Sequence, residues 1–136
     1  MRAVHLPDLS AIEHELFVEP VSELYRNVVV IRFRGDLRAG TGGVSDARTI
    51  EAWIGFATTL LGPDALVIDL GGLRCVGALP RHVINPVEPN LEEGFPLYIV
   101  TPPERDKVAA LPTESLCSSL EEAFERIRKA GPWAIR

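Results

Sequence analysis

The sequence predicts an α/β protein in which strands and helices alternate along the chain. Residues 28–34 show the two-residue alternation of a strand, with large apolar side chains on one face. Residues 45–61 carry apolar side chains at three- and four-residue steps, which is the period of an amphipathic helix. Residues 65–70 form a nearly continuous apolar run, the pattern of a central parallel strand covered on both faces.

The first half of the chain also carries the signals that begin and end these elements. Residues 1–15 lack a clear period and are expected to form an arm or a short edge element, and residues 15–18 to form a hairpin partner for the first strand. Glycines at 40, 42 and 43 predict a flexible loop before the helix, which Ser45 or Asp46 would cap. Gly62 and Pro63 end that helix.

In the second half, four prolines in residues 77–96 argue against a long helix there, because proline lacks a backbone donor. Residues 97–100 are expected to form a further strand. Thr101 and Glu104 have the spacing of a capping box, which predicts a helix to about Leu111. Ser118 and Glu121 repeat that spacing at the start of a last helix, whose outward ion pairs would be Glu122–Arg126 and Glu125–Lys129.

Composition limits the class of protein. The 136 residues fit one domain, 1–136, and the formal net charge of −5, with acids and bases intermixed, lacks the basic stripe that nucleic acids require. No apolar run reaches the ~20 residues of a membrane span, and the first fifteen residues lack the apolar core of a signal peptide. We therefore expect a cytoplasmic domain that binds neither nucleic acid nor membrane, with Cys75 and Cys117 as buried thiols.

No motif in the sequence defines a catalytic or metal centre. The histidines are scattered without ligand spacing, and the glycine loop before the first helix lacks the lysine of a phosphate-binding loop. Asp36 and Asp69 stand at strand positions that would allow shared acid–base work, but each also suits a structural role at a strand end. The sequence predicts no catalytic residue, no metal and no cofactor.

The order of these motifs resembles the STAS domain of anti-sigma factor antagonists and sulfate-transporter tails. The resemblance spans residues 17–130 and depends on the Gly35-Asp36-Leu37 turn, the strand and turn at 66–73, and the helix opening at 119–123. It implies an α/β fold with a mixed four- to five-stranded sheet and helices packed mainly on one face. It also implies a protein partner, such as an anti-sigma-like kinase or a signalling complex.

The STAS switch is a serine that is phosphorylated at the start of the helix after the central strand. The matching residues here, 76–80, read Val-Gly-Ala-Leu-Pro, and no serine or threonine occurs between Thr59 and Thr101. The resemblance therefore predicts a divergent member that serine phosphorylation does not switch at this loop.

These observations favour a non-catalytic interaction or regulatory module over an enzyme. Its expected partner-binding face joins the turn after the first strand to the loop after the central strand, at Asp36, Arg38, Gly72, Arg74, Gly77, Ala78 and Arg81. The alternative is a small-molecule-binding protein or small enzyme, in which residues 80–96 would close over Asp36, Asp69 and His82. A homodimer also stays open.

Overall fold

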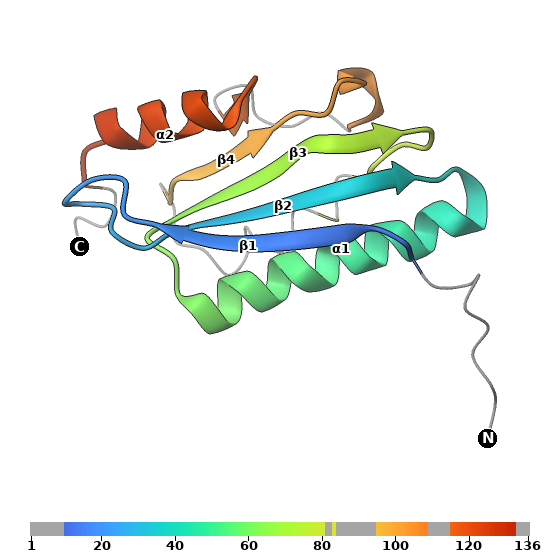
Figure 1. Cartoon of the computed structure of the whole chain (residues 1–136), viewed down its shortest axis with the longest axis horizontal. Helices are drawn as coiled ribbons and strands as arrows, with labels where there is room; N and C mark the ends of the chain where they lie inside the picture. The colour runs from blue at the N-terminus through green and yellow to red at the C-terminus, as the bar shows by residue number, and fades with distance from the viewer. Residues whose placement is uncertain (1–9, 81–82, 84–94, 109–114, 133–136) are drawn as a thin grey trace.

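A computed structural model describes residues 10–80, 83, 95–108 and 115–132. The chain forms two α-helices, five strands and a short 3-10 turn in these regions (Figure 1). In chain order they are β1 Glu13–Glu19, β2 Val28–Leu37, α1 Gly40–Leu61, β3 Ala65–Cys75, β4 Leu97–Val100, η4 Arg105–Lys107, β5 Leu116–Cys117 and α2 Leu120–Lys129. No helix in these ranges is long and apolar enough to cross a bilayer.

The strands form one mixed sheet in the order β1-β2-β3-β4-β5. β1 is antiparallel to β2, with Phe17 opposite Val30, whereas β2, β3, β4 and β5 run parallel to one another. The expected hairpin, the central position of β3 and the five-stranded α/β sheet are therefore confirmed.

The two helices cover opposite faces of the sheet, and this differs from the expectation of helices mainly on one face (Figure 1). Ile50 and Ile54 of α1 pack in one buried cluster with alternate residues of β2, such as Ile31. Ala123 and Ile127 of α2 belong to a second cluster, with Val28, Val30 and Val67. Because β2 and β3 are apolar on both faces, each face needs its own cover.

Helix α1 begins five residues before its expected start. Its N-cap is Ala39, which offers no side-chain cap, and the glycine run forms the first helical turn instead of a loop. Thr49 Oγ1 donates to the Ser45 carbonyl at 3.0 Å, so Ser45 lies inside the helix. Glycine suits this turn because a Cβ on Gly43 would overlap the carbonyl group of Arg38. The predicted end is confirmed, since Gly62 ends the helix with φ 51°.

The helix predicted to start at Thr101 is absent from residues 101–108, and its remainder falls outside the described residues. Only the 3-10 turn Arg105–Lys107 forms there. Glu104 accepts a hydrogen bond from Cys75 N at 3.2 Å instead of capping its own segment. Val108 pairs with Leu79 in an isolated parallel bridge, so contacts with distant residues replace the local helix.

Helix α2 forms as expected, with its cap shifted by one residue. Ser119, not Ser118, is the N-cap, and its side chain accepts from Glu122 N at 3.1 Å. The side chain of Glu122 in turn accepts from Ser118 N. The outward pairs Glu122–Arg126, at 2.9 Å, and Glu125–Lys129, at 3.5 Å, are confirmed.

A buried tyrosine links the β1–β2 connection to the end of α2. Tyr25 is 1% exposed, and its hydroxyl donates to the carbonyl of Gly131 at 2.6 Å. Tyr25→Phe keeps the ring but leaves that carbonyl without this donor, so we expect it to lower the free energy of unfolding by about 1 kcal/mol. Urea unfolding measures this loss, with Tyr98→Phe as the control because no bond from the Tyr98 hydroxyl occurs in the described chain. Equal losses in both variants would contradict the assigned role.

Candidate functional site

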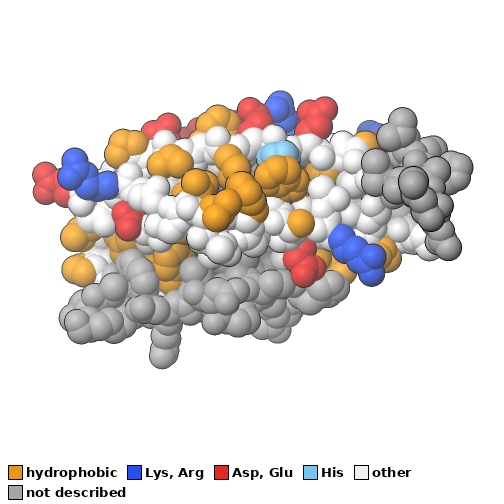
Figure 2. Space-filling view, turned by 90° about the horizontal axis from the view of Figure 1, so that it is seen from below, with side chains coloured by type: hydrophobic (Ala, Val, Ile, Leu, Met, Phe, Trp, Pro, Cys, Tyr) orange, Lys and Arg blue, Asp and Glu red, His pale blue; other side chains and the backbone are white. Residues whose placement is uncertain are grey.

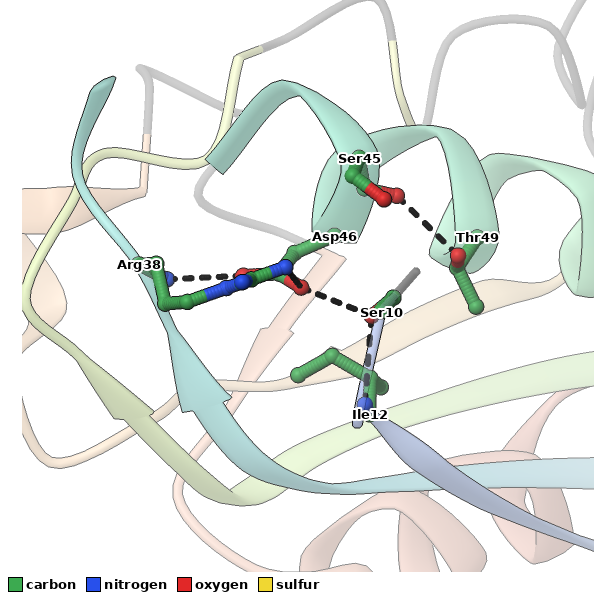
Figure 3. Close-up of polar contacts among 6 residues, drawn as sticks. All are labelled: Ser10, Ile12, Arg38, Ser45, Asp46 and Thr49. Atoms are coloured by element: carbon green, nitrogen blue, oxygen red, sulfur yellow. Dashed lines mark hydrogen bonds and ion pairs between the residues drawn. The ribbon is translucent and has the colours of Figure 1, made fainter. Parts of the chain in front are cut away.

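The turn between β2 and α1 is built around a buried carboxylate (Figure 3). Asp46 is fully buried, and its two oxygens accept from the backbone N of Arg38 at 2.9 Å and from the Arg38 guanidinium at 3.0 and 3.1 Å. Ser10 Oγ donates to the same carboxylate at 2.7 Å and accepts from Ile12 N at 3.1 Å. Asp46 therefore joins the segment before β1, the end of β2 and the first turns of α1.

The charge of Asp46 is stabilised by these donors. Burial on its own would raise the pKa of Asp46, but the hydrogen bonds from Arg38 and Ser10 outweigh burial and hold that pKa below the ordinary carboxyl value. The same contact raises the pKa of Arg38. Asp46 is thus an ionised structural group at neutral pH.

A cleft of about 490 Å³ opens beside this turn. Its walls come from the β2–α1 turn, the first two turns of α1 and the segment after β3, and the lining residues are Arg38, Ala39, Gly40, Gly43, Val44, Ala47, Arg48, Gly77, Ala78 and Pro80. The amides of Val76 and Gly77 donate to the Leu37 carbonyl at 3.0 and 2.9 Å. These bonds hold the two strand ends together and fix one wall of the cleft.

Gly77 is required by the close approach of these two segments. A Cβ at this position would lie 2.9 Å from the Arg38 carbonyl carbon and 3.0 Å from Ala39 Cα. Both neighbours are backbone atoms, which cannot swing aside as a side-chain tip would. The packing at Gly77 is therefore a property of the backbone.

The structure separates the partner-binding residues predicted from the sequence. It brings Arg38, Gly77 and Ala78 together in the cleft. Asp36 and Arg74 are cross-strand neighbours that form an exposed ion pair at 3.2 Å, outside the cleft lining. The other two predicted residues also differ from this group. Gly72 lies opposite Arg34 in the β2–β3 register, and Arg81 lies outside the described residues.

The alternative site at Asp36, Asp69 and His82 is not assembled in the described chain. Asp69 pairs with Arg32 at 3.0 Å and accepts from Gly71 N at 2.9 Å. Asp36 lies four residues beyond Arg32 on the same strand, which places the two carboxylates roughly 13 Å apart along the sheet. Proton sharing needs hydrogen-bond distance, so these acids cannot act as a pair. His82 and most of residues 80–96 lie outside the described residues.

Sequence reasoning missed Arg48 and the roles of Asp46 and Ser10. Asp46 has the residue type and position of a helix cap, so the sequence alone offered a local role for a side chain that makes distant contacts. Arg48 is exposed and sits one helical turn after Val44, on the cleft side of α1. The sequence offered one signal for Arg48, namely an arginine near the start of a predicted helix that follows a glycine-rich segment.

Apolar side chains also gather on the outer surface of α1, away from the cleft. Figure 2 shows this face, with a histidine next to the apolar side chains. Phe56 and Leu60 are exposed, and Phe56 contacts Trp53 edge-to-face with ring centroids 5.5 Å apart. His14 of β1 stacks on Trp53 at 3.6 Å. His14 therefore belongs to this aromatic cluster. The homodimer stays a prediction.

Both cysteines are buried free thiols, as expected. Burial raises the pKa of Cys75 to about 11, with nearby Glu104 adding to the shift. Burial also raises the pKa of Cys117. A thiol with a raised pKa is a poor nucleophile at neutral pH. Among the described residues, no three His, Cys, Asp or Glu side chains gather closely enough to hold a metal ion.

The described elements define an α/β domain with one mixed five-stranded sheet, as the STAS resemblance implies. No protein-family model matches the chain, and no curated protein is significantly similar to it. Among solved structures, the chain is similar to an anti-sigma factor antagonist from Mycobacterium paratuberculosis. The two share 17% identity with a TM-score of 0.49, over 91% of this chain and 98% of that one.

Proposed function

We propose that this chain is a non-catalytic protein-interaction module with a regulatory role in the cytoplasm. Its partner would be a protein, of the kind that the STAS resemblance implies, such as an anti-sigma-like kinase or a signalling complex. The binding face is the cleft beside the β2–α1 turn, at Arg38, Gly77 and Ala78, together with the neighbouring ends of β2 and β3, at Asp36, Gly72 and Arg74. Arg81, also predicted from the sequence, lies outside the described residues.

The chemistry of the cleft lining carries this proposal. Among the described residues, the lining consists of glycine, alanine, valine, proline and two arginines. It presents no carboxylate, imidazole, thiol or hydroxyl side chain, which are the usual acids, bases and nucleophiles of enzymes. Small side chains allow a partner backbone to come close, and arginines supply charge-assisted hydrogen bonds. Such a lining suits binding and offers little for catalysis.

The proposed module differs from a serine-switched antagonist. Residues 76–80, which form one wall of the cleft, contain no hydroxyl side chain. A phosphate therefore cannot be added to this wall, and binding here would be controlled by other means, such as the amount of partner present.

Ala78 offers a direct test, because it is exposed and lines the cleft. Tagged wild type, Ala78→Glu and Ala78→Ser are used for affinity capture from the source organism's lysate, with quantitative mass spectrometry of the retained proteins. We expect Ala78→Glu to lose a specific partner, because a longer charged side chain would fill the cleft, and Ala78→Ser to keep it.

Arg26→Glu is the matched control for the change in charge, since Arg26 is exposed in the β1–β2 connection at the other end of the sheet (Figure 1). It should retain the partner. If Ala78→Glu and wild type retain the same proteins in the same amounts, the cleft is not the binding face.

A further inference from the structure

The charge of the cleft is opposite to that of the chain. The protein has 19 acidic and 14 basic side chains, yet both charged residues that line the cleft in the described chain are arginines, Arg38 and Arg48. An occupant of this cleft therefore meets positive charge on a protein that is negative as a whole.

The two arginines have different roles. Arg38 is held by Asp46, whose buried carboxylate offsets its charge. Most other described arginines are also paired with an acid of the chain, namely Arg32, Arg34, Arg74, Arg126 and Arg128. Arg48 is exposed and forms no ion pair within the described residues. Its guanidinium is available to an anionic group from outside.

The surface next to Arg48 is apolar. Val44 precedes it by one helical turn and is 52% exposed, and Ala47 and Pro80 complete this part of the lining. Residues four apart on a helix have Cβ atoms about 5–6 Å apart. Neighbouring residues of an extended chain are about 3.3 Å apart and their side chains point to opposite faces, so this spacing corresponds to residues two positions apart on one face of an extended segment.

We infer that the cleft binds an extended segment of a partner protein that carries an apolar side chain and an aspartate or glutamate two positions apart. The apolar side chain packs on Val44 and Pro80, and the carboxylate pairs with the guanidinium of Arg48. This inference rests on the proposed function, because it specifies the chemistry of the partner at the same cleft.

A displayed library of random short peptides tests the inference without a known partner. Peptides are selected on immobilised wild-type protein after depletion on Ala78→Glu, which removes those that bind elsewhere. We expect the selected peptides to share an acidic residue and an apolar residue separated by one intervening residue. Selected peptides are then synthesised with a fluorophore, and their Kd values are measured by fluorescence anisotropy.

Charge reversal identifies the contact. Arg48→Glu should weaken the acidic peptides about tenfold or more, since it places like charges together. Replacing the peptide's acid by lysine should restore binding to this variant and weaken binding to wild type. Arg26→Glu is the matched control and should leave Kd unchanged. Melting temperatures of both variants are measured first to show that they are folded.

The outcomes separate the two proposals. Cleft-dependent peptides that lack an acid, or that bind Arg48→Glu as tightly as wild type, would overturn the acidic-segment inference and leave the interaction module standing. If selection yields no peptide that depends on the cleft, and the lysate capture also retains no cleft-dependent protein, both proposals fail. Both proposals are supported if Arg48→Glu weakens binding of the acidic peptide and the lysine-containing peptide restores it.

Discussion

Asp46→Ala is expected to lower the free energy of unfolding by about 3 kcal/mol, because it removes a buried charged acceptor that several donors share. The variant would leave the backbone N of Arg38 and the hydroxyl of Ser10 without this partner, and it would open a small void under α1. Chemical denaturation followed by circular dichroism measures the loss through the urea midpoint at constant m-value.

Asp106→Ala is the control for this experiment. Asp106 is exposed in the 3-10 turn, and no hydrogen bond or ion pair of its side chain occurs in the described chain. We expect a change of less than about 0.5 kcal/mol there. A similar midpoint for the Asp46 and Asp106 variants would show that the Asp46 contacts contribute little.

The same carboxylate predicts how stability depends on pH. The folded-state pKa of Asp46 lies below its unfolded value of about 3.9, so the unfolded chain binds the proton first. The stabilisation from its ionised form is complete well above pH 4 and is lost as pH falls through the folded pKa. Asp46→Asn should therefore lose less stability than wild type between pH 5 and pH 2, relative to each protein's value at pH 7. If the free energy of unfolding falls equally with pH in wild type and Asp46→Asn, Asp46 is not the source of this pH dependence.

Gly77→Ala is expected to lower the free energy of unfolding by about 2 kcal/mol, because the added methyl group overlaps backbone atoms of Arg38 and Ala39. Relief requires the segment after β3 to move away from the end of β2, which would strain the hydrogen bonds from Val76 and Gly77 to the Leu37 carbonyl. A substitution at Gly77 therefore tests packing as well as binding, and Ala78 is the cleaner position for binding studies.

Gly55→Ala makes the matched comparison, since the chemical change is identical. Gly55 lies in the interior of α1, and a Cβ there would meet no atom within 4 Å. We expect this variant to be more stable by about 0.5–1 kcal/mol, because alanine favours the helix over glycine. If both variants shift the urea midpoint in the same direction, the close approach at Gly77 is not rigid.

The core of the fold could be predicted because its signals are local and repeat along the chain. The two-residue period of Val28–Leu37 and the apolar run that begins at Ala65 identify β2 and β3 as strands with two buried faces. The position of the helices could not be derived so directly. The apolar pattern of β2 and β3 shows that both faces of the sheet must be covered. It does not show that α2, rather than another segment, packs on the second face.

The errors have a common cause in long-range contacts. Thr101 and Glu104 have the spacing of a helix cap, but Glu104 bonds Cys75, twenty-nine residues earlier in the chain. Asp46 was expected to cap its own helix but bonds Ser10 and Arg38. In both places a short-range rule gave way to tertiary contacts, which carry no periodic signal. Gly77 and Ala78 were predicted to belong to a partner-binding face and both line the cleft, but the atoms that come close to Gly77 belong to the chain's own backbone at Arg38 and Ala39.

Gly43 and Gly77 both pack closely against the Arg38 carbonyl, so main-chain atoms form the walls of the cleft there. The side chains of Val44, Arg48 and Ala78 line the cleft without forming these backbone contacts. Under the proposed function, recognition would therefore depend on side chains, whereas the shape of the cleft depends on main-chain packing. Substitutions at these three positions would then change the proposed binding surface while the stability of the domain changes little. A family of such domains would then keep glycines at 43 and 77 and diverge at 44, 48 and 78.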